Sequence, residues 1–273
     1  MVAINNFFIR TLSGIFFVAV IVGSILIDSF AFAVVFASIS GWTVYEFHKL
    51  TNQQESVNVN PLAGLIGGVI LFISSFLYAS GIFLYPIYSF YGIYIVIVFI
   101  SGLYFQNINP LHSWAYFITG QIYIALPFSL LNYILFIHNS QPYILLAFFI
   151  TIWINDTGAY LVGSAIGKHK LFERISPKKT WEGFFGGAVF ALISGYVFSL
   201  LIPEISLLNW LIFSEIVVVF GTFGDLAESL MKRTVHVKDS GNAIPGHGGM
   251  LDRFDSMLLA GPVIFIYLSF LFR

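Results

Sequence analysis

Cysteine is absent from the 273 residues of this chain, and charged residues are scarce. Without thiols the chain has no disulfide, no cysteine nucleophile and no thiolate metal ligand. Twelve basic and 13 acidic residues leave a formal net charge of −1. Because a nearly neutral chain exerts little long-range attraction on a polyanion, we expect no nucleic-acid partner.

Several well-known catalytic motifs are also missing. The sequence contains no P-loop, no G-x-S-x-G nucleophile elbow and no H-E-x-x-H metal helix. These absences argue against a Walker-type nucleotide site, a serine hydrolase of the α/β-hydrolase kind and a zinc metalloprotease.

Apolar residues, in contrast, are abundant. They make up 58% of the chain, Phe alone occurs 31 times, and the mean hydropathy is +0.90. Soluble globular domains are about 45–50% apolar, so this composition predicts an integral membrane protein. A helical span needs about 20 mostly apolar residues, and the apolar runs predict an all-α, polytopic fold with about nine transmembrane helices. The predicted spans are residues 12–27, 30–44, 62–78, 82–104, 114–137, 143–162, 184–202, 208–225 and 257–272.

The few charges are concentrated in one part of the chain. Residues 156–255 hold 19 of the 25 charged positions, and the basic residues among them lie in two stretches at residues 163–183 and 228–253. Both stretches can lie on one membrane face, which the positive-inside rule makes cytoplasmic. We therefore predict a single membrane domain over residues 1–273, with residues 1–142 mainly scaffold and residues 143–273 supplying the catalytic helices and cytoplasmic loops.

Acidic side chains lie in or beside the predicted spans. Asp156 interrupts an apolar run and Asp225 ends one, and an unpaired charge at that depth costs several kcal/mol. Asp252 and Asp255 share one helix face, as do Asp225 and Glu228, because each pair is three residues apart. Convergent carboxylates favour a hard divalent cation such as Mg²⁺. Ion pairing between helices is the alternative, and for Asp156 it remains open.

A glycine-rich turn enters the last predicted helix at residues 246–249, which read GHGG. Glycine permits close backbone approach, and a helix start offers free N–H groups to a phosphate. Basic residues surround this turn at Lys232, Arg233, Lys238 and Arg253, a cation density that suits a polyphosphate. For Lys232 and Arg233 alone, snorkelling at the membrane interface is the simpler explanation.

A second candidate phosphate site is SPKKTWEG at residues 176–183. Lys178 and Lys179 precede a span, and Ser176 and Thr180 add hydroxyl donors. The cluster suits a lipid headgroup or a nucleotide phosphate, although a juxtamembrane basic cluster with no ligand has the same composition.

The stretch SLMKRTVHVKDSGNAIPGHGGMLDRFDS at residues 229–256 resembles the signature of the phosphatidate cytidylyltransferase family, also called CDP-diacylglycerol synthases. Further elements typical of the family are NDTGAY at residues 155–160, SPKKTWEG at residues 176–183 and GDLAES at residues 224–229. The resemblance implies a reaction of CTP with phosphatidate that gives CDP-diacylglycerol and pyrophosphate.

The resemblance also implies roles for individual residues. The lipid phosphate is the nucleophile and needs no general base, so positioning and charge neutralisation would carry the catalysis. Mg²⁺ is the implied cofactor, with a second cation such as K⁺ as an option. The implied catalytic residues are Asp225, Asp252, Asp255, Lys232, Arg233 and Arg253, of which the three aspartates hold metal; the substrate-binding residues are Ser176, Lys178, Lys179, Thr180, Lys238, His247, Gly248 and Gly249; the supporting residues are Asn155, Asp156, Glu228 and Asp239.

Partners and location follow in the same way. The implied partners are CTP, phosphatidate and membrane lipids, in a bacterial inner membrane with the active site facing the cytoplasm. Small-residue spacings at Gly64/Gly68, Gly163/Gly167 and Gly183/Gly187 indicate helix packing faces, and a homodimer through such a face is a further expectation.

Three other functions remain as alternatives. A secondary transporter would also place aspartates in broken, glycine-rich helices, although no inverted repeat is visible. A CTP-dependent lipid kinase would use similar phosphate contacts but needs a base for its hydroxyl substrate. An inactive scaffold protein is the least favoured alternative, because all the charged residues of the family motifs are present.

Overall fold

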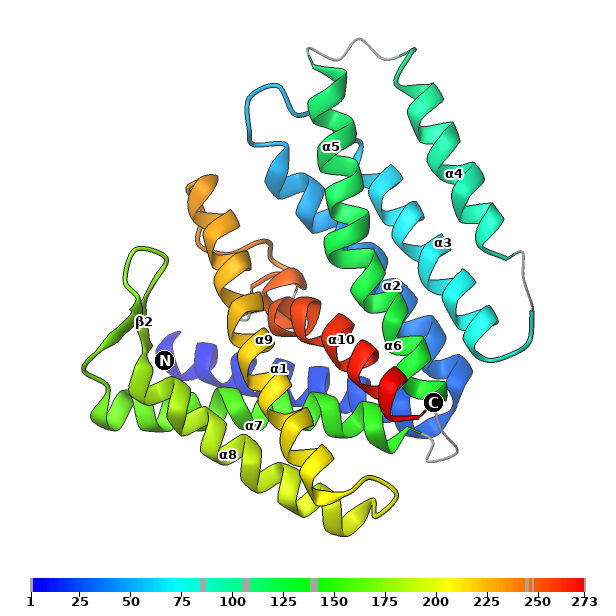
Figure 1. Cartoon of the computed structure of the whole chain (residues 1–273). Helices are drawn as coiled ribbons and strands as arrows, with labels where there is room; N and C mark the ends of the chain where they lie inside the picture. Colours follow the sequence, from blue (N-terminus) through cyan, green and yellow to red (C-terminus); the bar gives the residue numbers. More distant parts are fainter. Residues whose placement is uncertain are drawn as a thin grey trace. The chain divides into compact units, whose positions relative to one another are not determined.

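The computed structural model describes residues 2–83, 87–104, 109–137, 142–243, 246 and 248–272, with the backbone alone described for residues 2–10. All nine predicted apolar segments contain helix, one of them interrupted by a π-helical turn, which confirms the helical membrane fold (Figure 1). Seven described helical segments are long and apolar enough to cross a membrane, and two shorter apolar helices cover Thr11–Ile27 and Tyr88–Ser101. The elements are α1 (Val2–Ile27), α2 (Ser29–Thr51), α3 (Pro61–Ala79), α4 (Tyr88–Ser101), α5 (Pro110–Gly120), η1 (Gln121–Ala125), α6 (Leu126–Phe136), α7 (Tyr143–Ile166), β1 (Lys170–Phe172), β2 (Ser176–Thr180), α8 (Trp181–Leu201), α9 (Leu207–Thr234) and α10 (Leu251–Leu271).

Local sequence explains where several helices begin. An Asn-Pro pair starts both α3 and α5, with the asparagine as N-cap and the proline in the first turn. Asn60 Oδ1 accepts a hydrogen bond from the Leu62 N–H at 2.9 Å, and Asn109 Oδ1 accepts one from the His112 N–H at 3.2 Å. Proline is favoured in the first turn because the N–H it lacks has no partner within the helix there.

The chain divides into two compact units. The first comprises Met1–Tyr133 and Thr234–Phe254, and the second comprises Ile134–Arg233 and Asp255–Arg273. In the first unit, α2 packs along α3 (Figure 1). Gly64 and Gly68 of α3 face α2, where a β-carbon at Gly68 would lie 3.2 Å from Val44 Cγ2. The Gly64/Gly68 spacing is therefore a helix packing face within the chain, as predicted.

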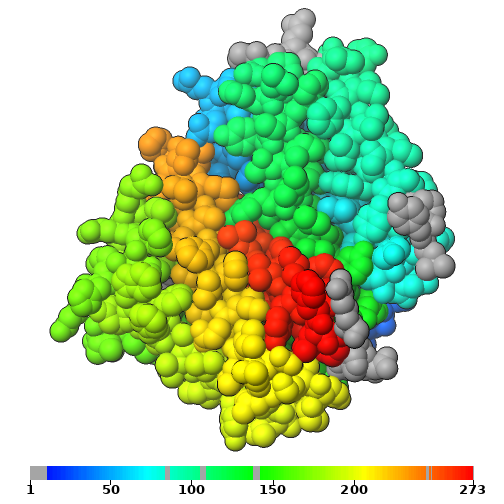
Figure 2. Space-filling model, in the orientation of Figure 1, coloured from blue at the N-terminus to red at the C-terminus, as the bar shows by residue number. Residues whose placement is uncertain are grey.

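Aromatic residues fill the core of the first unit. The Phe254 ring, at the start of α10, lies 5.6 Å from the Phe17 ring and 5.1 Å from the Phe128 ring, centroid to centroid. Farther along the unit, the surfaces of α4 and α5 adjoin in Figure 2, and the rings of Phe99 and Trp114 lie 5.0 Å apart. Edge and offset aromatic contacts of this kind stabilise packing beyond the apolar area they bury.

In the second unit α7 and α8 form a closely packed pair (Figure 1). A β-carbon at Gly163 would lie 3.3 Å from Gly183 Cα, and one at Gly187 would lie 2.9 Å from the Asn155 carbonyl oxygen. Small residues thus allow the two backbones to approach, and these faces are filled from within the chain. The homodimer stays a prediction, and a dimer interface would have to use a surface other than the contact between α7 and α8.

A short β-hairpin connects α7 to α8, and the sequence analysis did not predict it. Strands β1 and β2 pair in antiparallel fashion, with Lys170 opposite Thr180 and Phe172 opposite Ser176. The hairpin orders the whole SPKKT part of the motif as strand β2. The predicted all-α class therefore holds for the helical spans and omits this element.

Two helices extend beyond their predicted ends and carry charged residues with them. Helix α9 continues to Thr234, and α2 continues to Thr51. In α9 the Glu228 and Lys232 side chains form an i,i+4 ion pair, Nζ to Oε2, at 2.6 Å. Such a pair, with the acid N-terminal to the base, favours the helix. Lys232 and Arg233 therefore lie on α9, although the sequence analysis assigned them to the basic stretch that follows the span ending at residue 225.

Candidate active site

A cavity of about 500 Å³ lies in the second unit. It is bounded by α7, the β-hairpin, α8, α9 and α10, so segments from across residues 155–256 meet around it. Its lining includes both acidic and basic side chains. The described lining residues are Asn155, Asp156, Ala159, Tyr160, Gly163, Ser164, Lys170, Leu171, Lys178, Lys179, Thr180, Gly183, Phe184, Thr222, Asp225 and Ser256.

An ion pair joins the hairpin to α9 at the cavity wall. The Lys179 Nζ lies 2.5 Å from Asp225 Oδ2, and both side chains are about 30% exposed. The other carboxylate oxygen, Asp225 Oδ1, accepts a hydrogen bond from Ser229 Oγ at 3.2 Å. Asp225 is thus held from two sides. The sequence analysis had assigned Lys179 to substrate binding, and the structure pairs it with Asp225.

Two further carboxylates lie near this pair. The Asp255 carboxylate is close enough to those of Asp225 and Asp156 for the charges to repel, and close enough to Lys179 to be attracted. Gly224 makes the approach of α10 to α9 possible, because a β-carbon there would meet the Asp255 carbonyl oxygen and would lie 3.1 Å from Ser256 Cα. The glycine before Asp225 thereby lets Asp225 and Asp255 come together.

The residues beside Asp156 and in the hairpin are held by local contacts. Asn155 is buried, and its Nδ2 donates to Asp156 Oδ1 at 3.5 Å. Thr180 is buried as the N-cap of α8, where its Oγ1 accepts from the Gly183 N–H at 3.1 Å. Lys178 is exposed at the cavity, and Ser176 is half-buried in β2. Of the predicted substrate ligands in the hairpin, Thr180 therefore has a structural role as the N-cap of α8.

Within the signature stretch, the segment between α9 and α10 is held by a carboxylate of the first unit. Asp252 Oδ2 accepts hydrogen bonds from the Gly249 N–H at 2.7 Å and from the Ser240 N–H at 3.0 Å. Gly248 has a φ of +82°, a conformation open to glycine but strained for residues with a side chain. The Asp252 carboxylate therefore joins the backbone at Ser240 to the backbone at Gly249.

Glu46 is the functional candidate that sequence reasoning missed. This α2 residue is only 5% exposed, and its Oε2 accepts from the Leu251 N–H at 3.0 Å. Oε1 accepts from Trp42 Nε1 at 3.1 Å. The available signal was a lone carboxylate directly after an apolar run, but the predicted span ended at Val44 and the region was interpreted as scaffold.

Several predicted phosphate ligands lie on the surface. Arg233, Lys238 and Arg253 are exposed, as is the predicted supporting residue Asp239, and none of the four is among the described lining residues of the cavity in the second unit. His247 lies outside the described residues. Asp252 belongs to the first unit, and Asp225 and Asp255 belong to the second. The contacts described above therefore connect two of the three predicted metal ligands, Asp225 and Asp255.

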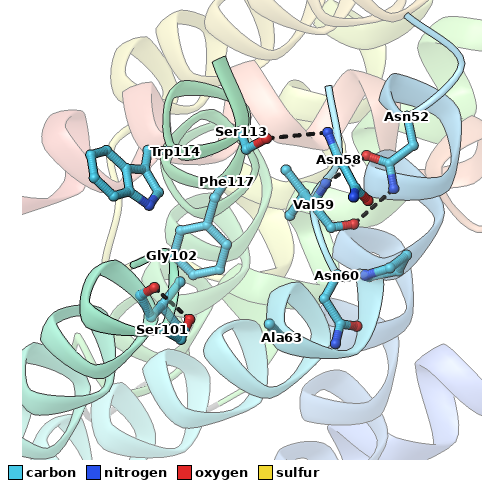
Figure 3. A pocket seen from close by; sticks show the side chains of 12 residues that line it. Asn52, Asn58, Val59, Asn60, Ala63, Ser101, Gly102, Ser113, Trp114 and Phe117 are labelled. Carbon is cyan, nitrogen blue, oxygen red and sulfur yellow. Dashed lines mark hydrogen bonds between the residues drawn. The ribbon is translucent and has the colours of Figure 1, made fainter. Parts of the chain in front are cut away.

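A second cavity, of about 420 Å³, lies in the first unit (Figure 3). Its polar lining is neutral: the Asn52 side chain bonds the backbone of Val59 in both directions, and Ser113 Oγ accepts from the Asn58 N–H at 3.2 Å. No charged residue is among its described lining residues. A site without cations cannot neutralise a phosphate, so this cavity is a poor candidate for either predicted substrate.

The carboxylates of Asp156 and Asp225 in the cavity of the second unit, with Asp255 close to them, have the donor chemistry of a hard-cation site. Among the residues that the structure describes, no three acidic or histidine side chains form a ready-made metal cage. Magnesium sites commonly use one or two carboxylates and complete the shell with water and substrate phosphates. The donor set fits that kind of site.

Comparison with known proteins identifies the family. The model of the cytidylyltransferase family matches residues 8–271. The chain is 34% identical to the phosphatidate cytidylyltransferase of Bacillus subtilis (strain 168) over 273 residues, covering 95% of this chain and 97% of that protein. Enzymes of the same name match about half of the chain and about half of their own length: the one from Staphylococcus saprophyticus is 50% identical over 127 residues, and the one from Haemophilus influenzae is 42% identical over 142 residues. This membrane protein therefore belongs to the cytidylyltransferase family.

Proposed function

We propose that this chain is a phosphatidate cytidylyltransferase, which joins CTP and phosphatidate to give CDP-diacylglycerol and pyrophosphate. The observation that carries the proposal is the cavity of the second unit, where Lys179 and Asp225 meet beside Asp255 and exposed Lys178. Near full-length similarity to an enzyme of that name supports the choice of substrates.

The chemistry explains why this cavity needs no conventional catalytic triad. A phosphatidate oxygen attacks the α-phosphorus of CTP, and the bond from that phosphorus to the bridging oxygen breaks as pyrophosphate leaves. The attacking phosphate is already anionic at neutral pH, so no residue has to remove a proton. The protein must align two anions that repel each other, and charged side chains suit this task.

Asp225 and Asp255 are the residues that would hold a divalent cation, with Asp156 beside them. Mg²⁺ in such a site supplies charge neutralisation and a template for the triphosphate. The resemblance also implies a metal role for Asp252, which lies in the first unit and there accepts from the N–H groups of Ser240 and Gly249; its metal role stays a prediction. A monovalent cation such as K⁺ remains a secondary expectation.

The lysines of the hairpin would receive the lipid headgroup. Lys178 and Lys170 are exposed and line the cavity, whereas Lys179 is paired with Asp225. An arriving phosphate would compete with Asp225 for Lys179, and the Asp225 carboxylate oxygen released in this way would be available to a cation. This exchange would couple lipid binding to metal binding. Arg233, Lys238 and Arg253 remain the proposed contacts of the triphosphate.

The orientation in the membrane follows from charge. Basic residues concentrate in the hairpin region and at the end of α9, and cytoplasmic loops carry an excess of Lys and Arg. We therefore place the active site on the cytoplasmic side of a bacterial plasma membrane, where CTP is available.

The acceptor test separates this function from its nearest rival. Purified protein in detergent would be given α-labelled CTP, Mg²⁺ and either phosphatidate or diacylglycerol. Label in the organic phase with phosphatidate, and none with diacylglycerol, supports cytidylyl transfer. Folded protein that leaves all label in the aqueous phase with both lipids contradicts it.

A further inference from the structure

Glu46 reaches from α2 to the glycine-rich segment that leads into α10, here called the signature loop, whose described residues are 240–243, 246 and 248–251. Its Oε2 accepts from the Leu251 N–H at 3.0 Å, a contact between residues 205 positions apart. A charged group buried in an apolar helix needs donors to offset its lost hydration. Glu46 obtains them from Trp42 on its own helix and from the backbone that begins α10.

The same carboxylate also packs against both ends of the signature loop. A β-carbon at Gly241 would lie 2.7 Å from Glu46 Oε1, and one at Gly249 would lie 2.6 Å from Oε2. A side chain at either position would press on the Glu46 carboxylate, so glycine lets both backbone positions approach it closely. Ser240 is also buried at this point, next to Gly249.

Asp252 holds the loop from the other side. Its carboxylate binds the N–H groups of Ser240 and Gly249. Two acidic side chains thus fix the two ends of one loop, although they are close enough for their charges to repel. Like charges are tolerated side by side only when donors hold each of them, and here the loop backbone provides those donors.

We propose that Glu46 is a positioning residue for the reaction: it fixes the signature loop and the first turn of α10, and so holds Asp252 and the adjacent turn in the geometry that binds the metal-bound nucleotide. The role goes beyond the proposed function and rests on it for the identity of the nucleotide. It assigns a task in the active region to a helix that the sequence marks as scaffold.

The test compares Glu46→Gln with Glu55→Gln in the full-length protein. Glutamine keeps the size of the side chain, but its amide offers one acceptor oxygen and turns an NH₂ donor toward the other N–H. Glu55 is exposed in the α2–α3 connection and provides the matched control. Trp42→Phe removes one donor to Glu46 and leaves the Leu251 contact, so its effect should be smaller.

Two measurements separate positioning from general stability. Amide hydrogen exchange over residues 240–251 should rise in Glu46→Gln and stay unchanged in Glu55→Gln. The apparent KM for Mg²⁺–CTP should rise about tenfold, as expected for a lost hydrogen bond to a charged group, while the KM for phosphatidate stays within about twofold. Trp42→Phe should fall between the wild type and Glu46→Gln.

Three results would overturn the proposal. If Glu46→Gln leaves hydrogen exchange in the signature loop unchanged, Glu46 does not fix the loop. If hydrogen exchange in the loop becomes faster but the steady-state kinetics stay those of the wild type, Glu46 fixes the loop and has no role in the reaction. A fall in kcat that merely follows the folded fraction, with both KM values unchanged, leaves Glu46 a purely structural residue. Because hydrogen exchange does not depend on turnover, it tests whether Glu46 fixes the loop even if the wild type fails to transfer cytidylyl groups.

Discussion

Lys179 and Asp225 are joined by an ion pair whose Nζ and Oδ2 atoms lie 2.5 Å apart, and this pair ties the end of the β-hairpin to α9. The two residues are 46 positions apart in the chain. Their contact places one cation and one carboxylate at the wall of a single cavity. A cavity that presents both charges can receive a phosphate and a metal ion together.

Lys179→Gln should lower kcat/KM for phosphatidate about ten- to hundredfold, because it removes a charge-assisted contact to the lipid phosphate. Lys168→Gln is the control, since Lys168 is exposed on the same connection and does not line the cavity. Steady-state kinetics in mixed micelles measure both. Equal effects of the two substitutions would mean that only the general basic character of the connection matters.

Asp225→Asn and Asp255→Asn should each abolish turnover and leave the protein folded. Each removes a carboxylate from the proposed cation site, while the amide keeps the size of the side chain. Turnover over a range of Mg²⁺ concentrations, together with thermal unfolding in detergent, measures the two effects. Glu204→Gln, at an exposed position between α8 and α9, should behave as the wild type. Near wild-type turnover in either aspartate variant would remove that residue from the metal assignment.

Gly224→Ala should lower both the stability and the turnover, the latter at least tenfold. The new methyl would press on the backbone of Asp255 and Ser256, which cannot rotate away, and overpacking costs about 1–3 kcal/mol. Gly221→Ala, one turn earlier, meets nothing closer than Ser256 Cβ at 3.5 Å. Alanine favours a helix over glycine by about 1 kcal/mol, so Gly221→Ala should be neutral or stabilising. If the two variants have the same melting temperature and activity, the close approach of α9 and α10 at Gly224 is not what aligns the aspartates.

Thr180→Val should cost about 1 kcal/mol of stability, because valine cannot accept the Gly183 N–H at the start of α8. Thr180→Ser retains the hydroxyl and should lose much less. Thermal unfolding of the two variants tests the capping role. A catalytic effect of Thr180→Val with no change in melting temperature would instead restore Thr180 as a direct substrate ligand.

The helical framework was readable from the sequence because its cause is local. About 20 apolar residues in succession satisfy their backbone within one helix, and Asn-Pro pairs mark where α3 and α5 begin. The site was only partly readable. The spacing of Asp225, Asp252 and Asp255 indicated an acidic centre, and the structure brings Asp225 close to Asp255.

Contacts between distant residues were beyond the reach of local patterns. The Glu46–Leu251 hydrogen bond joins residues 205 positions apart in the sequence. The ion pair between Lys179 and Asp225 depends on how the hairpin packs against α9. The hairpin itself gave no alternating pattern, since SPKKT is polar throughout and contains a proline. Its strands are held by antiparallel pairing that sets Lys170 opposite Thr180 and Phe172 opposite Ser176.

The measurement that tests the central claim most directly compares CTP labelled at the α-phosphate with CTP labelled at the γ-phosphate, with phosphatidate and Mg²⁺, before and after EDTA. Cytidylyl transfer predicts α-label in the lipid, γ-label in aqueous pyrophosphate, and no lipid label once the metal is removed. Transfer of γ-label to lipid, or α-label transfer that is unaffected by EDTA, would contradict the proposed metal-assisted cytidylyltransferase.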